Sequence, residues 1–220
     1  MGTHWVFCVL FVFIKFSSGS ELGIHTEAGT TEPDAPGEVI VWFRNETNLV
    51  ILWKPPHPTT IFTQYKVSIA PPDAKNSILY VEKSDEPLGP GVAAFKDLVP
   101  GRVYNISIET VSGDKISRPT TVQFRTVPSK PQNISFDAIS TQSFVVHWEA
   151  PSEESDFDKY QISLGNGLPP VTVSKEDPTF WEFKDNLEPG KTYSVVIKTV
   201  SGRVVSLPVT SDVTLKSLPV

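Results

Sequence analysis

The side chains that could do chemistry in this chain are few and widely spaced. Its histidines are His4, His25, His57 and His147, and Cys8 is the single cysteine. A zinc site needs two to four ligands at short, characteristic spacings, and no two of the histidines have one. One cysteine can form neither an intramolecular disulfide nor a cysteine-based zinc site. We therefore expect no metal and no cofactor.

The sequence also lacks the residue patterns of common catalytic sites. The chain has no Gly-x-Ser-x-Gly turn and no histidine placed to act as a base for a serine. The acidic residues Glu153, Glu154, Asp156 and Asp158 could offer oxygen ligands to calcium, but they lack the alternating Asp/Asn and Gly pattern of a calcium loop. We interpret this acidic cluster as a solvated loop, and we expect no enzyme activity from this chain.

Composition narrows the class of protein further. A formal net charge of −6 leaves no basic surplus for nucleic acid or an anionic membrane surface. With 39% hydrophobic and 20% charged residues, the chain can bury a core. Twenty prolines, thirteen phenylalanines and one methionine favour strands joined by proline-containing loops over a helical bundle.

The N-terminus has the pattern of a secretory signal peptide. An apolar run at 5–14 is followed by small residues at 17–20, and it is too short to span a membrane. We expect cleavage after Ser20, with a tail over 21–32; the alternative is a buried N-terminal strand. Cleavage would remove Cys8, so the mature chain must be stable without disulfides. No later stretch is apolar for 18 residues, so we expect no membrane span.

The rest of the sequence is an internal repeat. Trp53 and Tyr65 recur 95 positions later as Trp148 and Tyr160, with the same spacing of twelve. Two Leu-x-Pro-Gly-x-x-Tyr segments follow, one in each unit, at Leu98 to Tyr104 and Leu187 to Tyr193. The repeat predicts two domains, over 33–127 and 128–220.

Apolar and polar residues alternate within each unit, which is the period of a half-buried strand. Tyr104, Ile106 and Ile108, for example, are expected to face the core, with polar residues between them. The first unit is predicted to have seven strands, at 38–43, 48–54, 62–70, 78–82, 92–96, 103–111 and 119–126. Their equivalents in the second unit are at 133–138, 143–149, 159–164, 170–174, 179–184, 192–200 and 203–214. The fold class is therefore all-β, with two tandem seven-stranded antiparallel β-sandwiches.

This pattern resembles the fibronectin type III family, whose domains carry a core Trp on the second strand, a Tyr on the third and a Leu-x-Pro-Gly-x-x-Tyr corner before the sixth. The resemblance implies that the corner tyrosine hydroxyl bonds back to the main chain a few residues upstream. It assigns eight residues to the structural core: Trp53, Tyr65, Leu98, Tyr104, Trp148, Tyr160, Leu187 and Tyr193.

A second repeated motif, Thr-Val-Ser-Gly followed by Ser-x-Pro, lies at 110–119 and 199–208. It is similar to the fibronectin repeats in the ectodomains of receptor-type tyrosine phosphatases of the vascular-endothelial class and their insect neuronal relatives. That resemblance implies a single-pass receptor whose membrane span and catalytic domain are not in these residues.

Surface residues provide the remaining candidates. Three Asn-x-Ser/Thr sequons, at Asn45, Asn105 and Asn133, are expected to be accessible, and secretion makes them candidate N-glycosylation sites. Trp42 and Trp181 each have at least one apolar neighbour and are candidates either for partner contacts or for edge and interdomain packing. No Arg-Gly-Asp tripeptide is present.

Two prolines in the short segment between the units predict a stiff linker with restricted motion. The leading hypothesis is an extracellular adhesion or receptor ectodomain piece, secreted or on the outer face of the plasma membrane, that binds or spaces extracellular proteins. The alternatives are the ectodomain part of a receptor-type tyrosine phosphatase and an accessory module of a secreted carbohydrate-active enzyme.

Overall fold

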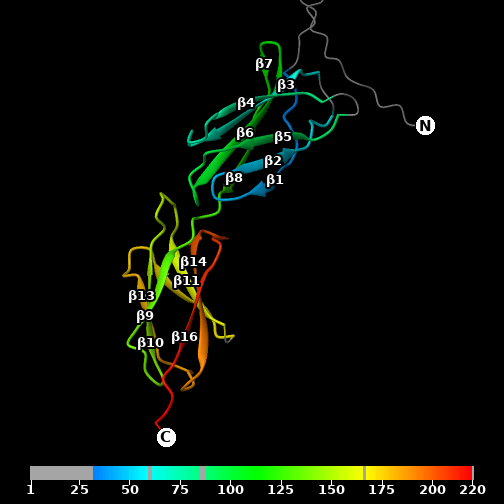
Figure 1. The fold of residues 1–220 in the computed structure, drawn as a ribbon. Helices are drawn as coiled ribbons and strands as arrows, with labels where there is room; N and C mark the ends of the chain where they lie inside the picture. Colours follow the sequence, from blue (N-terminus) through cyan, green and yellow to red (C-terminus); the bar gives the residue numbers. More distant parts are fainter. Residues whose placement is uncertain (1–31, 59–60, 85–87, 166, 220) are drawn as a thin grey trace, which may run out of the picture. The chain divides into compact units, whose positions relative to one another are not determined.

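The computed structural model describes residues 32–58, 61–84, 88–165 and 167–219. The predicted signal peptide, and the tail except for Glu32, lie outside the described residues. Every regular element within the described ranges is a β-strand, and all the strand pairs are antiparallel (Figure 1). The alternation of apolar and polar residues therefore predicted the fold class correctly: the chain is all-β, with two tandem sandwiches.

The first sandwich packs a three-stranded sheet against a five-stranded one. The smaller sheet has the order β1-β2-β5, from β1 (Val39–Arg44), β2 (Leu49–Trp53) and β5 (Gly91–Phe95). The larger has the order β4-β3-β6-β7, with β8 also on β6. Its strands are β3 (Gln64–Ala70), β4 (Ile78–Glu82), β6 (Val103–Ser112), β7 (Lys115–Ile116) and β8 (Thr120–Arg125).

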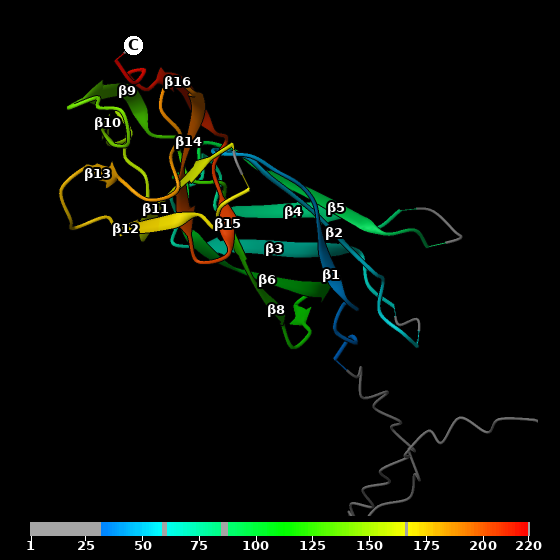
Figure 2. The same ribbon diagram turned by 90° about the horizontal axis from the view of Figure 1, so that it is seen from below.

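The second sandwich repeats this plan. Its smaller sheet has the order β13-β10-β9, from β9 (Gln132–Asp137), β10 (Phe144–Glu149) and β13 (Phe180–Phe183). Its larger sheet has the order β12-β11-β14-β15, with β16 also on β14 (Figures 1 and 2). The strands of that sheet are β11 (Lys159–Leu164), β12 (Val171–Ser174), β14 (Thr192–Ser201), β15 (Val204–Val205) and β16 (Val209–Thr214).

Each sandwich has its own core, organised around a Trp from the smaller sheet and a Tyr from the larger one. Trp53 meets Tyr65 edge to face with ring centroids 5.2 Å apart, and Trp148 meets Tyr160 at 5.3 Å. Such pairs contribute about 0.5–1.5 kcal/mol beyond the area that they bury. All eight residues assigned to the structural core are buried. The two cores need no disulfide to hold their sheets together.

The corner tyrosine of each sandwich ties strand β6 or β14 to the loop that leads into it. The Tyr104 hydroxyl accepts a hydrogen bond from the Val99 backbone N–H at 2.8 Å, and the Tyr193 hydroxyl accepts one from Glu188 at 2.8 Å. In both cases the donor lies five residues upstream. The bond that the family resemblance implies is therefore present in both units.

The end of each unit differs from the predicted strands. A two-residue strand, β7 or β15, pairs with the long strand before it, and a break then separates it from the last strand. The break contains Pro119 in the first unit and Pro208 in the second, and proline has no N–H to donate to a ladder. The predicted single strand at 203–214 is therefore two strands, and β7 was not predicted.

Candidate functional site

The outer face of the β1-β2-β5 sheet is apolar, although it points away from the core. The residues on this face lie opposite one another across the ladder: Ile40 is paired with Leu52, Leu52 with Val92, and Val50 with both Phe43 and Ala94. Their neighbours Leu49, Ile51 and Trp53 face the other way and are fully buried. We call Ile40, Phe43, Val50, Leu52, Val92 and Ala94 the outer apolar face.

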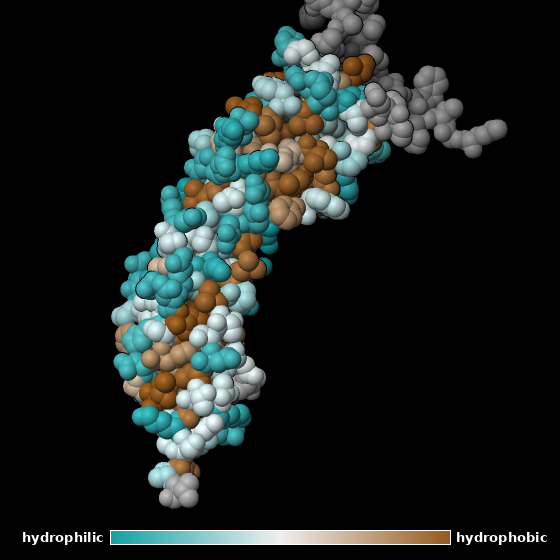
Figure 3. Space-filling model, viewed as in Figure 1, coloured by the Kyte–Doolittle hydropathy of each residue, from teal (hydrophilic) through white to brown (hydrophobic). Residues whose placement is uncertain are grey.

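Most of this face is open to solvent. Ile40, Phe43 and Val92 are 47%, 49% and 49% exposed. Trp42, the extra residue of a bulge between Val41 and Phe43, is 71% exposed. Figure 3 shows the hydrophobic surface gathered over β1, β2 and β5 of the first sandwich. Contiguous apolar surface of this kind marks sites of interaction more often than scattered single residues do.

The same face of the second sandwich is mostly polar, which provides an internal control. Its ladder pairs Ser135 with His147, His147 with Phe180, and Val145 with both Asp137 and Glu182. Four of these six residues are polar or charged, in the same fold. A sandwich of this type therefore folds without an apolar outer face, so the face on the first unit is not required for folding.

The tryptophans singled out in the sequence are not equivalent in the structure. Trp42 is 71% exposed at the edge of the outer apolar face, whereas Trp181 is 38% exposed and pairs with the buried Val146. Next to Trp181, the ring of Phe180 lies 5.9 Å from that of His147. Trp42 is the stronger candidate for contact with a partner.

The three sequon asparagines lie at the surface in different settings. Asn45 is half-buried in the β1–β2 turn, where its Oδ1 accepts the N–H of Thr47 at 3.0 Å. Asn105 is exposed on β6, and its Oδ1 accepts a bond from Gln123 at 3.1 Å. Asn133 is exposed on β9, but its Nδ2 donates to Glu149 at 2.6 Å. Nδ2 is the atom that would carry a glycan. It is already hydrogen-bonded in Asn133, whereas the bond of Asn105 is made by Oδ1, so Asn105 is the more available glycosylation site of the two on strands.

The repeated Thr-Val-Ser-Gly motif has a structural role in both units. Thr110 is buried; its N–H donates to Ser117 Oγ at 3.0 Å and its Oγ1 donates to the Asp34 carbonyl at 2.8 Å. Thr199 donates in the same way to Ser206 Oγ at 3.0 Å and to the Ser129 carbonyl at 2.6 Å. The motif thus ties the segment that enters each sandwich to the β6 or β14 hairpin.

A charged network links the corner of the first unit to the second, within the compact unit Glu32–Val220. The Arg102 guanidinium donates to Asp73 at 3.0 Å, to Asp156 at 2.8 Å and to Glu154 at 2.8 Å. Asp73 also accepts the Tyr104 hydroxyl at 2.9 Å. Burial, followed by the effect of Asp73, raises the pKa of Tyr104 to about 12, although the bond from Val99 opposes the rise.

Hydrogen bonds to two backbone carbonyl groups support the same junction. The Asp156 N–H donates to the Pro100 carbonyl at 2.8 Å, and Ser201 Oγ donates to the Gly101 carbonyl at 2.8 Å. Arg125 donates to the same carbonyl at 3.2 Å and also to Ser201 Oγ. A side chain at Gly101, whose φ is +72°, would overlap the Asp156 carbonyl oxygen. Only glycine satisfies both the backbone conformation and this close approach.

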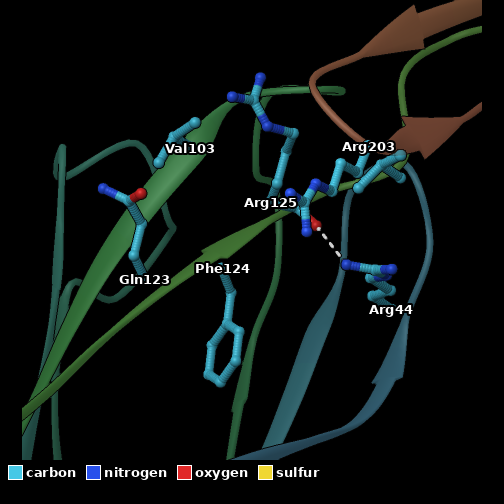
Figure 4. A pocket seen from close by; sticks show the side chains of 7 residues that line it. Arg44, Val103, Gln123, Phe124, Arg125 and Arg203 are labelled. Atoms are coloured by element: carbon cyan, nitrogen blue, oxygen red, sulfur yellow. Dashed lines mark hydrogen bonds between the residues drawn. The ribbon is translucent and has the colours of Figure 1, made fainter.

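Three arginines line a shallow pocket beside these contacts. Figure 4 shows Arg44, Arg125 and Arg203 around it, with Gln123 from β8, and Arg44 donates to the Arg125 carbonyl at 3.3 Å. No carboxylate of the described residues forms an ion pair with any of the three. The pocket is a small positive region on a chain of negative net charge.

The acidic cluster is solvent-exposed for the most part, as predicted, but two of its carboxylates also pair with an arginine that the sequence did not reveal as their partner. Asp156 and Glu154 bind Arg102, and Asp158 accepts the Gly202 N–H at 2.6 Å, while Glu153 is exposed. Spacing along the chain could not reveal a partner 54 positions away. The only indication of this ion pair in the sequence was the opposite charge of Arg102, which lies in the repeated corner motif.

Within the residues that the structure describes, no group of three or more His, Cys, Asp or Glu side chains could hold a metal ion. The same residues contain no helix long and apolar enough to cross a membrane.

Comparison with known proteins identifies the family. The sequence model of the family described as the fibronectin type III domain matches this chain twice, at residues 34–123 and 129–212. The chain belongs to the fibronectin type III family. Human tenascin-R is 30% identical over 189 residues, which are 83% of this chain and 13% of that protein. Mouse tenascin is 25% identical over 88% of this chain and 9% of its own length. The chain thus spans a small part of these relatives.

A solved structure shares the tandem arrangement. The two-domain fibronectin type III segment from chicken tenascin is 28% identical, with a TM-score of 0.54, and the match covers 81% of this chain and 98% of that one. The similarity therefore extends over both domains.

Proposed function

We propose that this chain is an extracellular adhesion or receptor module whose first fibronectin type III domain binds a protein through its outer apolar face. One observation carries the proposal: Trp42 and the apolar face beside it are exposed in the first sandwich, while the matching face of the second is mostly polar. Similarity to tenascins and the predicted signal peptide support an extracellular location.

Within this proposal, the second domain acts mainly as a spacer with a defined junction. Arg102, Gly101 and Ser201 give the connection directional hydrogen bonds, which would limit the range of orientations between the domains. N-linked glycans at Asn45, Asn105 or Asn133 would restrict partners to the faces that they leave open.

Binding of coated beads to cells tests the proposal. Beads carrying the secreted chain should bind to the surface of cells from the tissue that produces it. Trp42→Lys should abolish binding, whereas Tyr80→Lys should preserve it, because Tyr80 is 61% exposed on β4 in the opposite sheet. Equal binding of the wild type and Trp42→Lys, or no binding of the wild type, would refute the proposal.

A finer alternative is that the chain belongs to the ectodomain of a receptor-type tyrosine phosphatase. The repeated Thr-Val-Ser-Gly and Ser-x-Pro motif supports it, but Thr110 and Thr199 have the same structural bonds in both domains. A motif with that role can recur in any sandwich that uses the same hairpin. Sequencing the transcript beyond the codon for Val220 tests this alternative: it requires a membrane span of about 20 apolar residues and a phosphatase domain.

A further inference from the structure

The pocket between the arginines gathers cations from three separate elements. We call it the arginine pocket and define it by Arg44 at the end of β1, Arg125 at the end of β8 and Arg203 in the turn between β14 and β15, with Gln123 beside them. Arg44 and Arg203 are exposed, and Arg125 is half-buried. The volume is about 230 Å³, below the roughly 300–1,000 Å³ of pockets that enclose a small molecule. The arginine pocket is therefore suited to one charged group of a larger ligand.

Most of the guanidinium donors around this pocket have no acceptor within the described residues. Arg44 Nη1 donates to the Arg125 carbonyl at 3.3 Å, and Arg125 Nη1 donates to the Gly101 carbonyl at 3.2 Å and to Ser201 Oγ. In the described part of the chain, the Nε and Nη2 groups of these two arginines make no hydrogen bond, and neither does the Arg203 side chain. A guanidinium carries five N–H groups, so most of them remain for a ligand.

The charge of the pocket is positive, although the whole chain has a net charge of −6. The carboxylates of the junction are bound to other groups: Asp156 and Glu154 pair with Arg102, and Asp158 accepts the Gly202 N–H at 2.6 Å. Salt at physiological concentration screens charges that lie beyond about 8 Å. The three guanidinium groups therefore repel one another, and an anion bound between them would relieve that repulsion.

The chemistry of the donors favours an oxyanion with several acceptor oxygens. A planar guanidinium binds the oxygens of carboxylate and phosphate groups two at a time. Figure 4 shows the arginines on different sides of the pocket, an arrangement that suits a tetrahedral group better than one planar carboxylate. Outside the cell, sulfate esters of polysaccharides provide such groups on a polymer that can stay largely in solvent. This source agrees with the extracellular location proposed above.

A glycan at Asn105 would lie beside the arginine pocket. Asn105 is paired with Gln123 across β6 and β8, and Gln123 Nε2 donates to Asn105 Oδ1 at 3.1 Å. Gln123 itself lines the pocket. A glycan on the neighbouring residue would obstruct the approach of a polymer, so binding should be strongest in molecules without a glycan at this position.

We propose that the arginine pocket binds a sulfate group of an extracellular polysaccharide. The pocket is separate from the outer apolar face, because Arg44 is paired with the buried Leu49 and donates to a carbonyl of β8. The inference therefore adds a second binding surface to the proposed function. Three guanidinium groups open to water predict weak binding, with a dissociation constant of roughly 10–100 µM.

Calorimetric titration of the secreted chain with a heparin-derived oligosaccharide tests the inference. The chain carries Asn105→Gln, which removes the sequon and keeps an amide next to Gln123, whereas amidase digestion would leave an aspartate there. Arg44→Gln and Arg203→Gln should each weaken binding about three- to fivefold, and the two together should weaken it more than either alone. Unchanged melting temperatures would verify that these variants fold.

Arg118→Gln is the matched control, because it removes the same charge at an exposed position. Arg118 lies before the start of β8, and a rise of about 3.3 Å per residue places it about 20 Å from Arg125. Its substitution should leave the affinity unchanged. Trp42→Lys should leave it unchanged as well, so this experiment and the bead assay of the outer apolar face can fail independently.

Several results would overturn the inference. One is the absence of binding at about 1 mM oligosaccharide, and another is an equal loss of affinity in Arg118→Gln and Arg203→Gln. Equal binding after chemical removal of the sulfates from the oligosaccharide would show that carboxylates are the ligand. Binding of inorganic phosphate as tight as that of the oligosaccharide would make the pocket a general oxyanion site, and its assignment to a polysaccharide would fail.

Discussion

Substitution of the two corner tyrosines by phenylalanine provides a matched test of the junction network. Tyr104 and Tyr193 occupy equivalent positions, and each hydroxyl accepts one backbone N–H at 2.8 Å. Tyr104 also donates to Asp73 at 2.9 Å, and Asp73 in turn binds Arg102. The two substitutions therefore differ by one hydrogen bond to a charged group.

The magnitudes follow from these contacts. Tyr193→Phe leaves one backbone donor without its acceptor, which costs about 1–2 kcal/mol. Tyr104→Phe costs the same and also removes a bond to a carboxylate, worth about 1.5–3 kcal/mol when fully shielded. Because the Asp73 side chain retains 24% exposure, water replaces part of that bond. We expect Tyr104→Phe to be more destabilising than Tyr193→Phe by about 1–2 kcal/mol.

Hydrogen exchange with mass spectrometry during a urea titration reports on each domain in the intact chain. Peptides from β6 follow the first domain and peptides from β14 the second. In an Asp73→Ala background, the cost of Tyr104→Phe should fall to that of Tyr193→Phe, because the coupled bond is already lost. Equal costs for the two tyrosines in the wild-type background would refute the argument that Asp73 strengthens the first corner.

Four further outcomes are expected. Gly101→Ala should increase hydrogen exchange at the junction and destabilise the chain more than Gly190→Ala does. Both glycines have φ near +72°, but only a side chain at position 101 would overlap Asp156, so equal effects would contradict this reasoning. Trp148→Ala should lower the stability of the second domain by about 3–5 kcal/mol, and calorimetry should show the first transition unchanged. Because the pKa of Tyr104 is about 12 when folded and about 10 when unfolded, its contribution to stability should be full below pH 10 and fall by about 2–3 kcal/mol as the pH rises to 12. Burial also raises the pKa of Tyr65 and Tyr160, so a smaller fall should remain in Tyr104→Phe. Asn105→Gln should remove one glycan from the chain secreted by a eukaryotic host, read as a loss of mass before amidase digestion; an unchanged mass would show that Asn105 is not modified.

The fold could be predicted from the sequence because each sandwich depends on local patterns that repeat. Alternation along strands such as Tyr104 to Ile108 reveals the buried face, and the spacing from Trp53 to Tyr65 recurs in the second unit. The corner bond is also a local feature, since the Tyr104 hydroxyl reaches only five residues upstream. β7 was not predicted, and β15 was not separated from β16, because two-residue strands are too short for a period to appear.

The outer apolar face and the junction were decided by tertiary structure. Alternation shows which residues of β1 and β2 share a side, but only cross-strand pairing shows that Ile40, Leu52 and Val92 form one continuous apolar row. Arg102 and Asp156 are 54 positions apart, and no sequence period relates them. Patterns along the chain report on contacts within a strand, a turn or a repeat. Surfaces and ion pairs built from distant segments depend on how the sandwiches fold and meet.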